Sequence, residues 1–175
     1  MIRTTIAVIG FLLAAGALSA TAQPGSTDAE SELAHALVGA WLPLESGVAV
    51  SEGEGTPLSA KYEIDDGVFQ LSVYTSKSDT FSGDSFSEVI VDFNTGLVAK
   101  VDAITDSGDL AAAQSQKVTM TEAKRSLGEV TADVVKANAG YRAVRAMPAL
   151  DQGRPFAEVT LVRGDDWKVV TVPLN

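Results

Sequence analysis

The chain has 175 residues, with 23 acidic and 13 basic side chains, and its formal net charge is −10. An acidic protein repels phosphate backbones and anionic lipid, which argues against nucleic-acid binding. The chain has no cysteine, which excludes disulfides and thiolate metal sites.

The first 22 residues have the features of a secretory signal peptide. Arg3 provides a short positive region, and residues 6–18 form an apolar stretch of 13 residues, shorter than the roughly 20 that span a bilayer. Residues 20–22 read Ala-Thr-Ala, which is typical of a cleavage site and disfavours the alternative of an uncleaved anchor. We expect cleavage after Ala22, a periplasmic or secreted mature protein, and no stable membrane span.

Acidic residues are concentrated in the first half of the mature chain, whose net charge is −11. Residues 28–104 carry 14 acidic and 3 basic side chains, whereas residues 119–175 carry 7 and 8. The simpler interpretation is solubility, because net charge acts on solubility before it selects a partner. The alternative is that the first half offers an acidic surface to a basic partner.

Two helices are expected before the first strand. Residues 28–41 place apolar side chains at helical spacing, namely Leu33, Leu37 and Trp41. Residues 43–54 alternate weakly like a strand, but Pro43 suits the first position of a helix. Small and apolar residues also recur there at helical spacing: Leu44, Gly47, Val48 and Ser51. We therefore predict a second, short helix that ends at Gly55.

The next segment reads as a sheet. Strands are predicted at residues 56–65 and 68–76, joined by Asp66-Gly67, a dipeptide typical of tight hairpin turns. Alternate side chains of the second strand are apolar and polar, which predicts one buried and one wet face. A polar loop is expected at 77–85, a third strand at 86–93, a turn at Asn94-Thr95-Gly96 and an extended segment at 97–103.

The second half repeats this order of elements. An alanine-rich linker helix is expected at 106–123, and a helix at 126–138 begins with the capping-box pattern Ser126-x-x-Glu129. Strands are expected at 141–150, 154–163 and 167–174, with a turn at Asp151-Gln152-Gly153 that corresponds to Asp66-Gly67. The sequence therefore predicts two copies of one small α+β unit, which share a core or an interface because each copy alone is marginally stable.

Part of the first half resembles the PepSY domain, a family named after peptidase propeptides. The residues that carry the resemblance are Leu44-Glu45, Asp66-Gly67 and the run EVIVDFNTG from Glu88 to Gly96. Residues 126–174 are similar to a second unit, which has Gly164-Asp165-Asp166-Trp167 in place of the D-x-x-T-G turn.

The resemblance implies an α+β fold of two tandem PepSY/cystatin-like units. Each unit would be a helix packed on a three-stranded antiparallel sheet, with an extra helix before it. The units would occupy residues 28–104 and 126–175, joined by a linker helix at 105–125. The resemblance also implies binding or inhibition, for example of a peptidase, and it supplies no catalytic residue.

No catalytic, cofactor-binding or metal site is predicted from the residues themselves. Residues 83–85 and 106–108 superficially resemble serine-protease sequences, but a nucleophilic serine needs a base, and His35 is the only histidine. Asp92 with Thr95 and Gly96 is interpreted as turn chemistry. The remaining acids lack EF-hand spacing and are interpreted as solvated: Asp79, Asp84, Glu88, Asp106 and Asp109.

The second predicted sheet carries apolar residues on both faces. Its nominally outer face holds Phe156, Val162, Trp167 and Val169. We expect the linker helix to cover them, because a sheet that is apolar on both faces is covered on both; the alternative is a partner-binding patch. The sequence thus favours a non-enzymatic, periplasmic PepSY-like module, without a cofactor, that binds or inhibits a peptidase or another envelope protein. The alternative is a sensor-type module that binds a small ligand or cation through its acidic first half.

Overall fold

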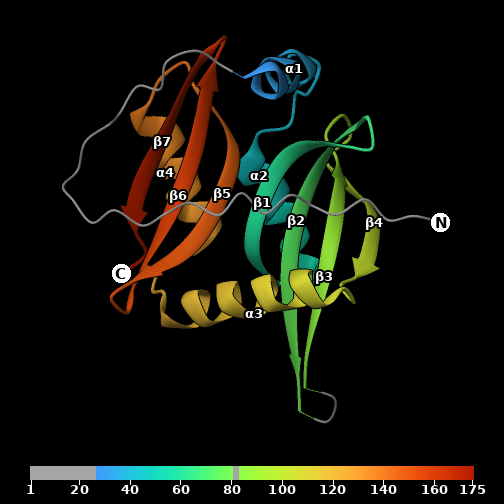
Figure 1. Ribbon diagram of the computed structural model, residues 1–175, viewed down its shortest axis with the longest axis vertical. Coiled ribbons are helices and arrows are strands. Elements are labelled where there is room, and N and C mark those ends of the chain that lie inside the picture. Colours follow the sequence, from blue (N-terminus) through green and yellow to red (C-terminus); the bar gives the residue numbers. More distant parts are fainter. Residues whose placement is uncertain (1–26, 81–82) are drawn as a thin grey trace.

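The computed structural model describes residues 27–80 and 83–175, and the predicted signal peptide lies outside them (Figure 1). Within this range the fold is α+β. The helices are α1 (Asp28–Leu37), α2 (Leu44–Ser51), the short 3₁₀ helix η1 (Glu52–Glu54), α3 (Ser107–Glu122) and α4 (Leu127–Ala137). The strands are β1 (Thr56–Asp65), β2 (Val68–Asp79), β3 (Gly83–Asp92), β4 (Leu97–Ala103), β5 (Arg142–Asp151), β6 (Arg154–Arg163) and β7 (Asp166–Pro173).

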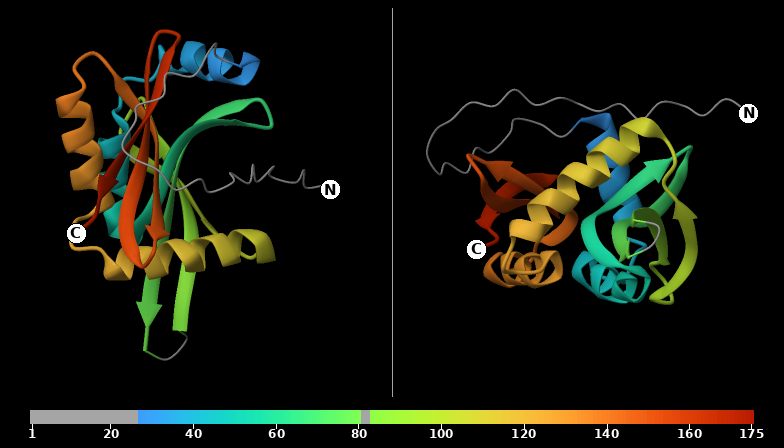
Figure 2. Two further views of the ribbon diagram at one scale, coloured as in Figure 1. Left: turned by 60° about the vertical axis from the view of Figure 1, so that its left-hand side comes forward. Right: turned by 90° about the horizontal axis from the view of Figure 1, so that it is seen from below.

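All seven strands form one antiparallel sheet in the order β4-β3-β2-β1-β5-β6-β7. Helices α2 and α4 lie side by side behind this sheet, α3 crosses one end of it diagonally, and α1 lies at the other end (Figures 1 and 2). Within the described residues no helix covers the central part of the opposite sheet face. We call this surface the open face.

The buried side chains of both halves form one core. The largest cluster joins residues of α2, β1, β2 and β3 with residues of α4, β5 and β6. Leu44 and Val48 of α2 and Leu127 and Val130 of α4 are each at most 1 % exposed. The expectation that the two halves share a core is therefore confirmed.

The backbone connection between the halves is much narrower than the shared core. Strands β1 and β5 pair only at Ala60–Ala146 and Lys61–Arg145, whereas nine residue pairs join β1 to β2. Side chains reinforce this seam at one end, because the carbonyl oxygen of Leu42 accepts hydrogen bonds from Tyr62 Oη at 2.6 Å and from Arg142 Nη2 at 3.1 Å. Packing, more than the ladder, holds the halves together.

Local sequence signals account for most element boundaries. The predicted helix at 43–54 is present, and its predicted stripe of Leu44, Gly47, Val48 and Ser51 is fully buried. Asp66 and Gly67 both have positive φ, at 47° and 77°, as a tight hairpin requires. The capping box at Ser126 is also present, since its side chain accepts from the Glu129 amide.

Three predictions about the elements are wrong. The first helix ends at Leu37, and Trp41 is 61 % exposed, with its indole N–H donating to the Asn94 carbonyl oxygen. The expected loop at 77–85 is a continuation of the β2–β3 hairpin, with Lys77 paired to Ser85. The three-stranded sheet expected of the first half has four strands, because the predicted extended segment at 97–103 is confirmed as strand β4 and pairs with β3.

The physical reasons for these differences are local. The chain turns after Leu37 because Leu42 N–H donates to the Phe93 carbonyl oxygen, and that bond ties the segment to the sheet. The β2–β3 hairpin extends through this polar segment because strand pairing is made by the backbone. Polar side chains are compatible with it where both faces of the hairpin are solvated. None of the helices in the described residues is long and apolar enough to cross a membrane.

Candidate functional site

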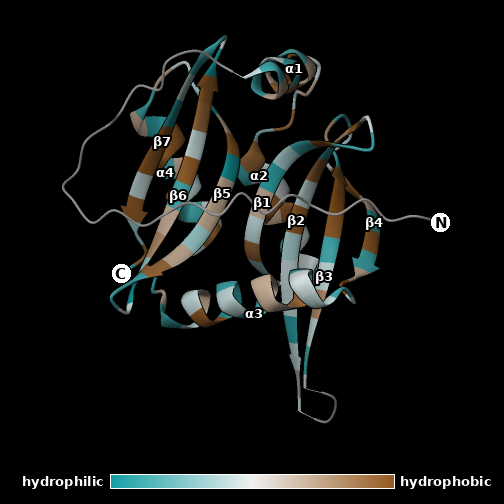
Figure 3. Cartoon of the chain, viewed as in Figure 1, coloured by the Kyte–Doolittle hydropathy of each residue, from teal (hydrophilic) through white to brown (hydrophobic). Residues whose placement is uncertain are grey.

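A row of cross-strand neighbours runs over the open face from one edge of the sheet to the other. Directly opposed residues of an antiparallel sheet point to the same face, so the register fixes which side chains gather there. In the order of the strands, this row consists of Lys100, Ile90, Ser72, Lys61, Arg145, Thr160 and Val169. Figure 3 shows that hydrophilic and hydrophobic residues alternate along these strands. The alternation buries the apolar set under α2 and α4.

Two residues of this row belong to a group of buried and half-buried polar side chains, which we call the polar cluster: Lys61, Glu63, Ser72, Tyr74 and Glu88. Lys61 Nζ is 2.5 Å from Glu63 Oε2, and Ser72 Oγ donates to Glu63 Oε1 at 2.8 Å. Tyr74 Oη donates to Glu88 Oε1 at 3.3 Å. Ser72 is completely buried, so the expected wet face is partly shielded from water at this point.

Burial sets the electrostatics of the polar cluster. Loss of hydration raises the pKa of Glu88, and the negative charge of Glu63 raises it further. The pKa of the Tyr74 hydroxyl is also raised, first by burial and then by the charge of Glu88. The pKa of Glu88 stays above its usual value even though Ser72 and Lys61 act to lower it. The folded protein therefore carries a carboxylate whose charge is incompletely compensated.

Glu88→Gln is expected to raise the free energy of unfolding at neutral pH. The folded state holds the pKa of Glu88 above its value in the unfolded chain, so stability falls as the pH rises from the unfolded to the folded pKa. At a pH above the folded pKa, the wild type has lost all of this stability. The glutamine variant loses none of it, because glutamine does not ionise. As the pH falls below 4.5, the ordinary pKa of a glutamate, Glu88 becomes neutral in the folded and in the unfolded chain. The stability difference between the wild type and the variant should then vanish.

Urea denaturation of both proteins at about pH 4 and about pH 7 measures this effect. Glu122→Gln is the matched control, because Glu122 is an exposed residue at the end of α3. A Glu88→Gln gain of the same size at both pH values, or a gain equal to that of the control, would contradict the electrostatic account.

The turn chemistry predicted for Asp92 is confirmed. Asp92 Oδ1 accepts hydrogen bonds from the amides of Asn94 at 2.8 Å and Thr95 at 3.1 Å, and these bonds lower the pKa of its carboxyl. Gly96 has a φ of 70°, which favours glycine. Asp106 has a comparable role, since its side chain caps α3 through the amides of Gly108 and Asp109.

The predicted loop acids do not gather into one site. Asp84 pairs with Lys117 of α3 and accepts from Ser78 Oγ at 2.9 Å, and the Lys117 contact lowers its pKa most. The side chain of Asp79 lies outside the described part. Among the described residues, no group of three or more histidine, aspartate or glutamate side chains is arranged to hold a metal ion.

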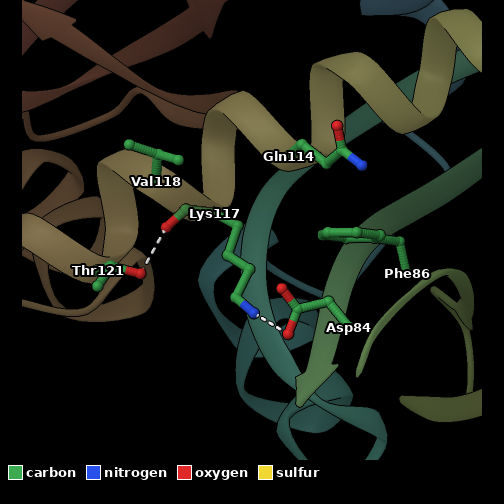
Figure 4. Close-up of a pocket in the computed structure, with 6 residues that line it drawn as sticks. All are labelled: Asp84, Phe86, Gln114, Lys117, Val118 and Thr121. Atoms are coloured by element: carbon green, nitrogen blue, oxygen red, sulfur yellow. Dashed lines mark hydrogen bonds and ion pairs between the residues drawn. The ribbon is translucent and has the colours of Figure 1, made fainter. Parts of the chain in front are cut away.

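The pair of Asp84 and Lys117 lines a pocket of about 460 Å³ between β3 and α3 (Figure 4). Phe86, Gln114, Val118 and Thr121 complete its wall. The two charges neutralise each other, as the ion pair drawn in Figure 4 shows. The pocket is open to solvent. Its two charged groups are paired with each other, so neither is free to bind a charged ligand.

The two serine sequences do not form a nucleophilic site in the described residues. Ser85 Oγ donates to the Lys77 carbonyl oxygen within the hairpin, and Ser107 opens α3. His35 lies in the last turn of α1, which is at the opposite end of the sheet from α3 (Figure 1).

The apolar outer face of the second half is covered unevenly. Val162 is buried, Phe156 and Trp167 are half-buried, and Val169 is 47 % exposed. Helix α3 contacts β5 and β6, as expected of the linker helix, while Trp167 packs against the main core. The indole nitrogen of Trp167 is buried and has no hydrogen-bond partner among the residues that the structure describes. These residues therefore form no continuous exposed patch.

Sequence reasoning missed the polar cluster as a unit, although a signal for it was present. Polar residues stand at alternate positions on two strands of a hairpin, Lys61 and Glu63 on one and Ser72 and Tyr74 on the other. The hairpin register that follows from Asp66-Gly67 places these residues on one face. Comparison of the chain with models of protein families, with curated proteins and with solved structures found no match.

Proposed function

We propose that the protein is a non-enzymatic binding module of the bacterial periplasm, built from two tandem PepSY-like units, that holds a protein partner on its open face. The observation that carries this proposal is the row of seven cross-strand neighbours, which we call the central row. It crosses the middle of a seven-stranded sheet face, where no described helix covers the strands and α3 covers only one end, so it offers a large and rigid docking surface. A peptidase is the partner class that we favour, since the PepSY resemblance points to it.

The order of elements supports the tandem arrangement. Strands β3-β2-β1 and β5-β6-β7 lie on either side of the seam, and a helix of each half, α2 or α4, packs behind its own strands and against the other helix. Strand β4 is an addition to the first unit. Such a pair of units presents one continuous face, which neither unit could offer alone.

The two sheet edges are weaker candidates for docking than the face. Strand β4 carries a bulge where its register shifts opposite Ile90 and Val91, and it displays a Lys100–Asp102 ion pair. Bulges and charges on an edge strand hinder the addition of a further strand. Strand β7 contains a half-buried lysine, Lys168, that donates to Asn138 Oδ1, and the strand ends at a proline. The open face therefore has the better claim to the partner.

Arg145→Glu is expected to weaken partner binding by at least about tenfold, because it reverses an exposed charge at the centre of the row. The mature protein would be immobilised, periplasmic extract passed over it, and the affinity of any retained protein measured. Inhibition of purified thermolysin-like metallopeptidases would be assayed in parallel. Arg154→Glu is the matched control, since Arg154 is exposed at the turn between β5 and β6.

If Arg145→Glu and Arg154→Glu retained the partner with equal affinity, the partner would not bind at the open face. If no protein is retained, while calcium or a small molecule raises the melting temperature, a ligand-binding module replaces the protein-binding one. Turnover of a substrate that a single substitution abolishes would overturn the non-enzymatic assignment.

A further inference from the structure

Glu88 differs from the other carboxylates on the open face of β1–β4. Three of those carboxylates have a lysine partner, Asp92 accepts two backbone amides, and Asp65 is exposed to solvent at the end of β1. The lysine-paired acids are Glu63, Asp84 and Asp102. Among the described residues Glu88 has no ion pair, and its hydrogen bond from Tyr74 is long, at 3.3 Å. It is also half-buried. Ser72 also acts on Glu88 by a hydrogen bond, and the charges of Lys61 and Lys100 reach it only over a longer distance. Glu88 is therefore a half-buried carboxylate without a cation in direct contact among the described residues.

Lys61, the cation of the polar cluster, does not form an ion pair with Glu88. Its ammonium group is 2.5 Å from Glu63 and lies over the ring of Tyr74, at 5.5 Å from the ring centroid. The ring thus already accommodates one cation in this environment. A second cation that reached Glu88 would lie beside the same aromatic side chain, because Tyr74 and Glu88 are directly opposed in the sheet.

The chemistry of the position favours a guanidinium over other cations. A guanidinium is planar, donates two parallel N–H bonds to a carboxylate and is weakly hydrated, so it loses little on entering a half-buried place beside an aromatic ring. A divalent metal needs several oxygen ligands, and the neighbouring ammonium of Lys61 repels a doubly charged ion more strongly than a singly charged guanidinium. The −11 charge of residues 28–104 attracts a basic segment over a longer range.

We propose that the polar cluster is the receptor for one arginine side chain of the protein partner, with the guanidinium bound by the Glu88 carboxylate beside the Tyr74 ring. This inference rests on the proposed function, of which it names the partner chemistry. The arginine of the partner supplies the positive charge that pairs with the Glu88 carboxylate. The rest of the partner covers the central row. Arg145, across the seam, faces the same partner and disfavours a uniformly basic one.

The test uses a single arginine and does not depend on the natural partner. Isotope-labelled mature protein would be titrated with N-acetyl-arginine methylamide and, separately, with the neutral citrulline analogue. We expect saturable NMR shifts at the amides of Lys61, Tyr74 and Glu88 with arginine only. Glu88→Gln should weaken this binding by about tenfold or more, the usual cost of losing a charge-assisted hydrogen bond. Asp65→Asn, which removes an exposed charge at the end of β1, should leave it unchanged.

The affinity should also fall at acidic pH, as Glu88 becomes protonated, and this loss should be absent from Glu88→Gln. Equal shifts with citrulline, no saturable response, or equal losses in Glu88→Gln and Asp65→Asn would each overturn the arginine assignment. A partner that is captured by the wild type and is lost with Arg145→Glu, but is unaffected by Glu88→Gln, would keep the docking face and reject the arginine receptor. The two proposals can therefore fail independently.

Discussion

Leu127→Ala is expected to lower the free energy of unfolding by about 2–5 kcal/mol, the usual cost of truncating a fully buried leucine. Leu127 begins α4, is 1 % exposed and belongs to the core cluster that joins both halves. The loss should therefore reach the first half as well. Urea denaturation would give the change in stability, and amide hydrogen exchange would show whether β1–β3 lose protection together with β5–β7.

Leu97→Ala is the control for this prediction, because Leu97 is 67 % exposed and the same truncation should change stability by at most about 0.5 kcal/mol. Loss of protection in β5–β7, with β1–β3 unchanged, would show that the halves unfold separately and that the shared core contributes little to their cohesion.

Gly55→Ala is expected to cost about 2–4 kcal/mol for a different reason, which is backbone strain combined with overpacking. Gly55 ends the 3₁₀ helix and leads into β1 with a φ of 152°. A Cβ atom there would lie 2.7 Å from the carbonyl oxygen of Ser76, a backbone atom of the neighbouring strand that cannot rotate away. Thermal and urea unfolding would measure the loss.

Gly53→Ala is the matched control, since Gly53 lies two residues earlier and a Cβ atom there meets nothing within 4 Å. It should be close to neutral. If the two alanine variants were equally stable, the junction between η1 and β1 would be able to relax, and the close approach of Gly55 to β2 would carry no structural importance.

Elements with strong local signals were predictable from the sequence. The short helix at 44–51 follows from Pro43 and a small-residue stripe, and every residue of that stripe is buried. The hairpin at Asp66-Gly67 follows from turn chemistry alone. The end of α1 was less predictable, because Trp41 fits the helical period of Leu33 and Leu37 although its environment is set by Asn94, more than fifty residues away.

The candidate site depended on information that the local sequence lacks. The alternation of β2 indicates that Ser72 and Tyr74 share a face, but the distance of Glu88 from Tyr74 depends on the register of a hairpin whose length was underestimated. The position of Arg145 beside Lys61 depends on the pairing of β1 with β5, which lie more than 70 residues apart in the sequence. Non-local register of this kind is fixed by packing and not by propensity.

The narrow seam between β1 and β5 has a consequence for the shape of the open face. Two ladder pairs impose little on the angle between the strands, so the contact of α2 with α4 sets that angle from behind. Gly128 lies at this contact: a Cβ atom there would make an ordinary contact with Val48 Cγ1 at 3.5 Å, so alanine would fit, whereas a larger side chain would meet α2. The angle between the two halves of the open face is thus controlled by residues that the partner never touches, and a side chain larger than alanine at residue 128 would change this angle without altering the chemistry of the face.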